Sequence, residues 1–157
     1  MEKQCFLILC GIRSSYNVGS IFRTADAAGV SKIYLTGVTP RPIDKFGRIN
    51  LQIAKTALGA EKSVLWEYKK SVVPLLSKLK KEGVQVIGLE QADNSIDYRK
   101  IKPKRHWALV LGEERKGLKS SVLSQCDIIA EIPMKGKKES LNVAVATGVA
   151  LFKIASI

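Results

Sequence analysis

The 157-residue sequence is poor in the side chains on which hydrolytic, redox and metal chemistry depend. It has one histidine, His106, so no second imidazole can activate a nucleophile elsewhere in the chain. The three cysteines, Cys5, Cys10 and Cys126, are odd in number and lack the spacing of disulfides or metal ligands. We interpret them as reduced core thiols in a cytoplasmic protein, and we expect no metal site.

Long apolar runs and acidic residues are also scarce. The longest uncharged apolar stretch, residues 141–152, is well short of the roughly 20 residues that a membrane-spanning helix needs, so no membrane partner is expected. Lysine and arginine number 26 against 14 acidic residues, which gives a formal net charge of +12. This balance favours nucleic acid as the partner, because each phosphate that a basic side chain neutralises releases counterions. A lysine surface that only keeps the protein soluble is the alternative.

Short β-branched runs alternate with helical stretches along the whole chain. Two of these runs, 84–90 and 107–112, are apolar at most positions, which is typical of strands covered on both faces of a parallel sheet. The alternation predicts one α/β domain over residues 1–157, with a mostly parallel, Rossmann-like sheet flanked by helices. In such a sheet, ligands lie at the carboxyl ends of the strands.

The first and last predicted helices carry further expectations. Asn17 is the expected N-cap of the first helix, and Gly29 stands where a left-handed C-terminal cap is wanted. The last helix, from about Leu141, is apolar on nearly every side as far as Lys153. A domain of this size buries one face by itself, and a subunit interface is the natural place for the other. We therefore predict a homodimer.

Three loops that follow predicted strand ends contain most of the polar and charged residues that are candidates for a functional site. None is a standard phosphate loop, because Leu118 stands where a Walker A motif needs lysine and no GxGxxG follows the first strand. This excludes the usual motifs for nucleotide triphosphatases and dinucleotide binding. His106 precedes a strand on its amino-terminal side, away from the expected ligand face, so we interpret it as structural.

Taken together and in order, the three loops resemble the three sequence motifs of the SpoU/TrmH family of SPOUT RNA methyltransferases. The matching segments are NVGSIFRTADAAGV (17–30), LVLGEERKGL (109–118) and IPMKGKKESLNVAVATGVAL (132–151). The resemblance covers almost the whole chain. It implies a C-terminal trefoil knot, an obligate dimer, and S-adenosylmethionine-dependent methylation of a ribose 2'-hydroxyl in structured RNA.

The same resemblance implies where the cofactor binds. It places S-adenosylmethionine, in a bent form, against the knot loops, among Leu89, Gly112, Ile132, Met134 and Leu141. This assignment agrees with the chemistry of adenine, which needs apolar walls and a few backbone hydrogen bonds, and Gly112 permits close backbone approach. The alternative is that Ile132 and Leu141 are simply core residues.

Catalytic residues are implied by the resemblance as well. Arg23 corresponds to the motif-one arginine, held beside Asn17 at the edge of the RNA site. Glu114 matches the acidic position of motif two better than Glu113, although both remain candidates. In motif three, Ser140 and Asn142 match residues that can bond the cofactor and support the arginine site; the alternative is that they cap the last helix.

Several loop residues at the expected ligand face are candidates for RNA contact. Tyr16 could stack on a flipped base, and the basic candidates are Arg13, Arg41, Lys45, Arg48, Lys116, Lys135, Lys137 and Lys138. The small size and the lack of a separate RNA-binding extension favour tRNA over rRNA as substrate. A non-catalytic RNA-binding or ribosome-assembly factor is the main alternative, and methylation of a base nitrogen is the second.

Overall fold

The computed structural model describes residues 2–157 and contains a seven-stranded sheet in which all strand pairs are parallel. The strands are β1 (Gln4–Cys10), β2 (Lys32–Thr36), β3 (Trp66–Lys69), β4 (Gln85–Leu89), β5 (Ile96–Asp97), β6 (His106–Leu111) and β7 (Ile128–Glu131). Their order in the sheet is β3-β2-β1-β6-β4-β7-β5. The predicted α/β fold with a mostly parallel sheet is therefore confirmed. The trefoil knot stays a prediction.

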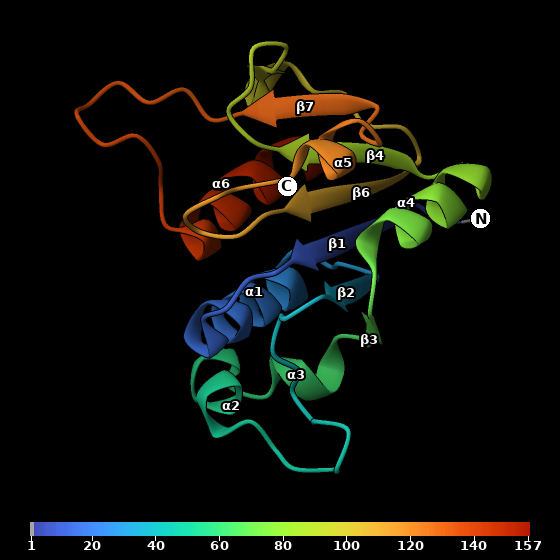
Figure 1. Cartoon of the computed structure of the whole chain (residues 1–157), viewed down its shortest axis with the longest axis vertical. Helices are drawn as coiled ribbons and strands as arrows, with labels where there is room; N and C mark the ends of the chain where they lie inside the picture. Colours follow the sequence, from blue (N-terminus) through green and yellow to red (C-terminus); the bar gives the residue numbers. More distant parts are fainter. Residues whose placement is uncertain (1) are drawn as a thin grey trace.

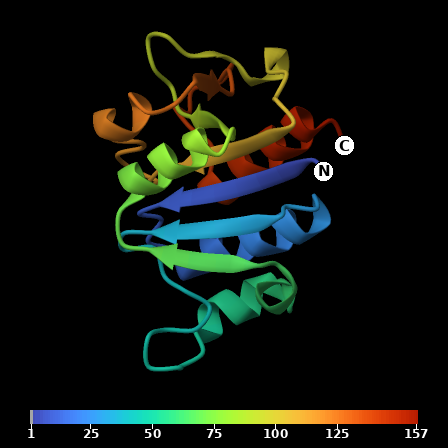
Figure 2. The same ribbon diagram turned by 90° about the vertical axis from the view of Figure 1, so that its right-hand side faces the viewer.

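Helices cover both faces of this sheet (Figures 1 and 2). They are α1 (Ser15–Ala27), α2 (Leu51–Ala57), α3 (Ala60–Ser63), α4 (Val72–Lys81), α5 (Ser120–Leu123) and α6 (Val143–Ala155), with a short 3-10 helix η1 (Tyr98–Lys100). The two longest, α1 and α6, lie on one face, and α4 and α5 lie on the other (Figure 2). The sequence did not predict β5, η1 or α3, which are short and lie in polar segments.

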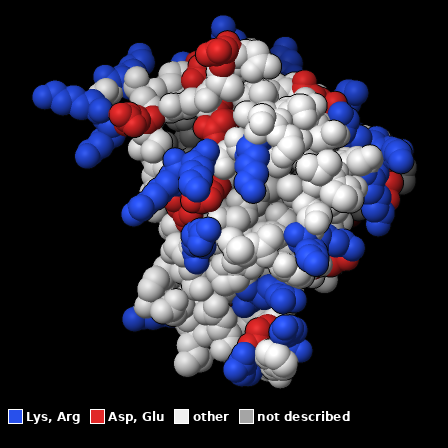
Figure 3. All heavy atoms as spheres, viewed as in Figure 1, with Lys and Arg blue, Asp and Glu red and all other residues white. Residues whose placement is uncertain are grey.

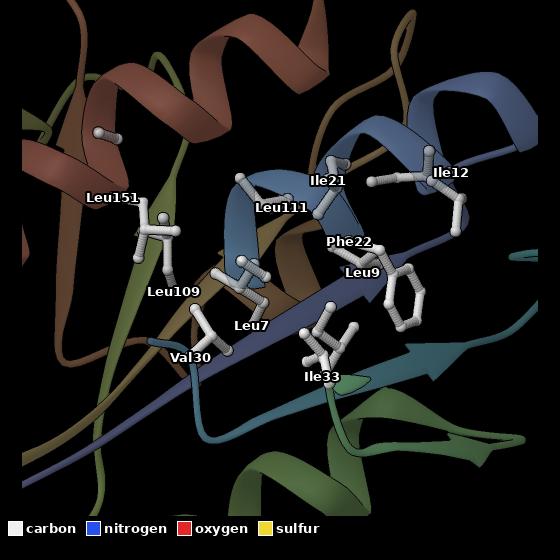
Figure 4. Packing of buried hydrophobic residues seen from close by; sticks show 14 of the residues in the cluster. Leu7, Leu9, Ile12, Ile21, Phe22, Val30, Ile33, Leu109, Leu111 and Leu151 are labelled. Atoms are coloured by element: carbon white, nitrogen blue, oxygen red, sulfur yellow. The ribbon is translucent and has the colours of Figure 1, made fainter. Parts of the chain in front are cut away.

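The core has two layers because successive strand residues point to opposite faces of the sheet. On one face, Leu7 and Leu9 of β1 pack with Phe22 of α1 and Leu151 of α6 (Figure 4). On the other face, Ile8 joins a second cluster beneath α4 and α5. Burial on both faces explains why the central strands are continuous apolar runs rather than alternating ones.

The N-terminal cap of α1 differs from the prediction. Ser14, not Asn17, is the N-cap, and its hydroxyl accepts a hydrogen bond from the Asn17 backbone N–H at 3.2 Å. The helix thus begins before Asn17, whose side chain is free for other contacts. At the other end, Gly29 follows the last turn with φ of +68°, as predicted for a residue that ends a helix in the left-handed region.

The last helix, α6, is apolar on two sides, and only one of them is covered in the chain. Thr147, Ala150, Leu151 and Ile154 are fully buried. The other side carries an exposed stripe, in which Val145 is 53%, Val149 38% and Phe152 37% exposed. No helix within residues 2–157 is long and apolar enough to cross a membrane.

Candidate active site

A cavity of about 270 Å³ opens at the carboxyl ends of β4, β6 and β7, where ligands bind in parallel α/β sheets. Figure 3 shows this side of the molecule hollowed beside the long loop that precedes α6. All five predicted cofactor residues line the cavity: Leu89, Gly112, Ile132, Met134 and Leu141. Residues that are separated by up to about a third of the sequence are thus brought into one pocket.

The walls of the cavity combine apolar side chains with unpaired backbone groups. Leu89 and Ile132 are half-buried and also pack against the core, so the core role considered for Ile132 holds together with its place in the cavity. Within residues 2–157, no backbone N–H of the segment 134–141 donates a hydrogen bond. Apolar walls beside free backbone groups suit a flat heteroaromatic ring such as adenine.

The loop from Gly112 to Leu118 is held against β4 by a carboxylate that sequence analysis missed. Glu90 accepts hydrogen bonds from the backbone N–H of Leu118 at 2.8 Å and from that of Gln91 at 2.9 Å. Gly117 lies so close that a Cβ there would be 1.9 Å from the Glu90 carboxylate, and a Cβ at Gly112 would be 2.5 Å from the carbonyl carbon of Gly117. Both glycines are therefore needed for the loop to fold back on itself.

A second missed residue, Gln91, attaches the long loop before α6 to the end of β4. Its side-chain amide donates a hydrogen bond to the carbonyl oxygen of Glu139 at 2.7 Å. Glu90 and Gln91 are the first polar residues after the apolar run of β4. Their place at a strand end was the signal that could have identified them.

A chain of hydrogen bonds joins the three loops. The Asn17 side-chain amide donates to the Glu114 carboxylate at 3.2 Å, and the Asn142 amide donates to the Asn17 side-chain oxygen at 3.2 Å. Glu114 thus contacts Asn17 through its side chain, whereas Glu113 accepts a hydrogen bond from the Gly117 N–H through its backbone carbonyl. Which of the two fills the acidic position of motif two stays a prediction. This network brings together side chains that are 97 and 125 residues apart.

The two motif-three candidates have different positions. Asn142 is the N-cap of α6, since its side-chain oxygen accepts from the backbone N–H groups of Ala144 and Val145. Ser140 lines the cavity but does not cap the helix, so a capping role for Ser140 is wrong. The helix begins at Val143, two residues later than expected, because Asn142 provides the cap.

Residues 4–152 match the family model described as the SpoU rRNA methylase family. The chain belongs to the SpoU rRNA methylase family. It is 36% identical over 149 residues to the 23S rRNA (guanosine-2'-O-)-methyltransferase RlmB of Pseudomonas aeruginosa, a match that covers 94% of this chain and 57% of that relative. The RlmB protein of Xylella fastidiosa is 38% identical, with 94% of this chain and 56% of the relative covered. The chain thus spans little more than half the length of these relatives.

Solved structures of the SpoU family agree with the fold. The AdoMet-bound rRNA methyltransferase from Sinorhizobium meliloti matches with a TM-score of 0.88 and 30% identity, over 99% of this chain and 57% of that one. A structure concerned with 2-OH methylation on tRNA matches with a TM-score of 0.81 and 26% identity, over 97% of this chain and 94% of that one. The cavity described above therefore belongs to a fold of which AdoMet-bound examples exist.

The arginine and tyrosine that the SpoU resemblance singles out lie on exposed parts of α1. Arg23 does not line the cavity, and within residues 2–157 it makes no hydrogen bond or ion pair. Tyr16 is also exposed, in the first turn of the helix. The single chain thus leaves both side chains free for an external partner.

The basic candidates divide between two places. Lys116 lines the cavity, Lys137 lies in the exposed loop before α6, and Arg13 is exposed just before α1. Figure 3 shows basic side chains around the hollow and on the neighbouring loop. Arg41 is not part of this group, because it lines a second cavity at the carboxyl ends of β2 and β3.

The cysteines and the histidine lie outside the SpoU site. Burial raises the pKa of the Cys5 and Cys10 thiols to about 12 and that of Cys126 to about 11, so all three are protonated at neutral pH and are poor nucleophiles. His106 is the first residue of β6, at the amino end of the strand as expected. Among residues 2–157, no three His, Cys, Asp or Glu side chains gather in a way that could hold a metal ion.

Proposed function

We propose that this protein is an RNA 2'-O-ribose methyltransferase that uses S-adenosylmethionine. The observation that carries the proposal is the meeting of the second and third motifs around one cavity, together with the hydrogen bonds by which Glu114 and Asn142 join Asn17 of the first motif. Membership of the SpoU family and the names of its curated relatives support the same reaction.

The cavity fits the cofactor in shape and in charge. Leu89, Ile132 and Leu141 supply apolar walls for adenine, and the unpaired backbone groups of 134–141 supply hydrogen bonds. Carboxylates such as Glu90 and Glu131 line the same cavity and favour a positively charged ligand. When bound, S-adenosylmethionine supplies an electrophilic methyl group on a sulfonium. A Leu141→Arg variant should lose cofactor binding, measured by calorimetry.

Arg23 is the residue to which we assign the chemistry. A ribose 2'-hydroxyl is a poor nucleophile at neutral pH, so its position and the loss of its proton limit the rate. Arginine stays protonated in proteins and is therefore unsuited to act as a simple base. Arg23 instead clamps an RNA phosphate and stabilises the developing alkoxide, while the phosphate or solvent accepts the proton. A bond from the 2'-oxygen to the methyl carbon forms as the carbon–sulfur bond breaks.

A homodimer is part of the proposal. The stripe of Val145, Val149 and Phe152 leaves apolar surface of α6 exposed to water, and a second copy of the chain would cover it. Helix α1, which carries Arg23, packs beside α6, since a Cβ at Gly148 would lie 3.6 Å from the Thr24 methyl group. Arg23 would then act beside the subunit interface. Light scattering that detects only a monomer of 17.2 kDa would contradict the dimer.

The identity of the RNA rests on the relatives. The curated relatives compared above are 23S rRNA methyltransferases, which makes rRNA the first candidate and gives no support to the preference for tRNA inferred from size. A tRNA substrate is the second candidate, because the structure concerned with tRNA methylation is matched over 94% of its length. A cytoplasmic location stays a prediction.

The decisive experiment maps methylated nucleosides in RNA. Total RNA is incubated with the protein and S-adenosylmethionine, digested, and examined by mass spectrometry, which separates ribose-methylated from base-methylated nucleosides. The expected product is a 2'-O-methylnucleoside at one position, lost in Arg23→Ala and retained in Arg105→Ala, which removes an exposed arginine before β6 at the opposite edge of the sheet. Base methylation would contradict the proposal. RNA binding without methylation would indicate the non-catalytic factor.

A further inference from the structure

The second cavity, of about 500 Å³, lies at the carboxyl ends of β2 and β3 and shares no lining residue with the first. Because all strands are parallel, both cavities open at the same edge of the sheet. In the strand order, β2 is two places from β6, and β3 is four places from β4. With a strand spacing of about 4.8 Å, the two cavities are about 10 to 20 Å apart along this edge.

A stacked arginine and tyrosine line this second cavity. The guanidinium carbon of Arg41 lies 4.0 Å from the centroid of the Tyr68 ring. The Tyr68 hydroxyl donates a hydrogen bond to the Gly37 carbonyl at 2.8 Å, which fixes the ring. Within residues 2–157, the Arg41 guanidinium has no hydrogen bond or ion pair, so its donors are free. A guanidinium held over an aromatic ring in this way offers a planar, charged group on which a base can stack.

The rim of the cavity is a small hairpin built around Asp44. Its carboxylate pairs with the Arg48 guanidinium at 2.7 Å, and its backbone N–H donates to the Arg48 carbonyl at 3.0 Å. Ile43 and Ile49 form an antiparallel bridge across the hairpin. These contacts hold the segment in one shape although it projects from the end of the molecule (Figure 1).

An exposed aromatic side chain lies in this hairpin. Phe46 is 70% exposed, and both the Lys45 ammonium and the Arg48 guanidinium lie 5.1 Å from its ring centroid. In the space-filling view, basic side chains lie beside acidic and uncharged ones at this end of the molecule (Figure 3). An exposed aromatic ring beside positive charges is the arrangement that binds single-stranded nucleic acid, with bases on the ring and phosphates on the cations.

We propose that the second cavity and its hairpin form a subsite for single-stranded RNA next to the methylated nucleotide, in which one unpaired base stacks on Arg41. The subsite rests on the proposed function to the extent that the substrate is RNA. It adds base stacking to what would otherwise be contacts with phosphate alone, and it selects substrates whose target lies in or beside an unpaired segment. The formal charge of +12 agrees with a polyanionic partner.

The test compares two probes and two variants. The probes are a short oligoadenylate and an abasic oligoribose phosphate of the same length. Arg41→Lys keeps the charge and removes the planar group. Arg105→Lys is the control, because it makes the same change just before β6, at the amino ends of the strands and far from both cavities. Arg41→Lys should weaken oligoadenylate binding roughly fivefold or more, since stacking one base contributes at least this much, and should not change binding of the abasic probe. Arg105→Lys should change neither.

A second variant and a cofactor measurement complete the test. Phe46→Ala removes an exposed ring, so the protein should fold normally and bind oligoadenylate more weakly. S-adenosylmethionine affinity should be unchanged in both variants. If Arg41→Lys loses affinity equally for both probes, or binds oligoadenylate as tightly as the parent protein does, the proposed subsite is overturned even if methylation is observed. Conversely, a selective loss for oligoadenylate would uphold the subsite in a protein that fails to methylate RNA.

Discussion

Replacing Glu90 with alanine should destabilise the protein and weaken cofactor binding at the same time. The Glu90 carboxylate is the acceptor for the backbone N–H of Leu118, a residue that is only 6% exposed, and for that of Gln91, which is exposed. In the variant, the Gln91 N–H turns to water. The Leu118 N–H is left without a partner, and an unsatisfied buried donor costs about 1–3 kcal/mol.

We therefore expect a loss of about 2 kcal/mol in the free energy of unfolding. For a protein of this size, that loss lowers the melting temperature by about 4–8 °C. Urea denaturation measures the first quantity and scanning calorimetry the second. Since Glu90 also positions the loop that forms one wall of the cavity, the affinity for S-adenosylmethionine should fall in the same variant.

Glu131→Ala is the matched control. Glu131 lines the same cavity, and within residues 2–157 its side chain makes no hydrogen bond or ion pair. The free energy of unfolding of Glu131→Ala should stay within about 0.5 kcal/mol of that of the parent protein. If Glu90→Ala is as stable as this control, the carboxylate does not hold the loop. If Glu90→Ala loses cofactor affinity without losing stability, Glu90 instead contacts the cofactor directly.

Two further substitutions test packing and electrostatics. Gly112→Ala would put a Cβ 2.5 Å from the carbonyl carbon of Gly117, so urea denaturation should show a loss of about 1–3 kcal/mol, accompanied by lost cofactor binding. Unchanged stability would mean that the loop can relax. Glu67 has its pKa lowered from 4.5 to about 2 by hydrogen bonds from Lys32 and Lys69. A lowered pKa stabilises the fold above pH 4.5, and this contribution is lost as the pH falls to about 2. Glu67→Gln should therefore cost less than about 1 kcal/mol of unfolding free energy at neutral pH, because both ion pairs are partly open to solvent. At the acid end it should cost nothing, and a difference in stability that persists at low pH would refute the assignment.

The sequence by itself determined the fold class and, through its resemblance to the three family motifs, five residues that line the first cavity. Short continuous apolar runs are typical of strands covered on both faces, and loops that follow such strands meet at one edge of a parallel sheet. Leu89, Gly112 and Ile132, which the resemblance to the SpoU/TrmH motifs implies as cofactor residues, lie at such strand ends and line the cavity. The three motifs, in the order in which they follow one another along the chain, indicated the family.

Local errors arose where several polar residues compete for one role. Asn17 and Ser140 both have side chains that can cap a helix, but Ser14 and Asn142 occupy the cap positions. The choice depends on where the loop turns into the helix, and that point is set by packing against other elements rather than by the few residues around the cap.

Only the tertiary structure decided which distant groups meet. The strand order places β6 between β1 and β4, so loops far apart in sequence become neighbours, and Asn17 can bond to both Glu114 and Asn142. The same order separates Arg41 from the cavity and places it against Tyr68. Hydrogen bonds and stacking act over a few ångströms, and sequence spacing carries no information about contacts at that range between elements that pair out of order.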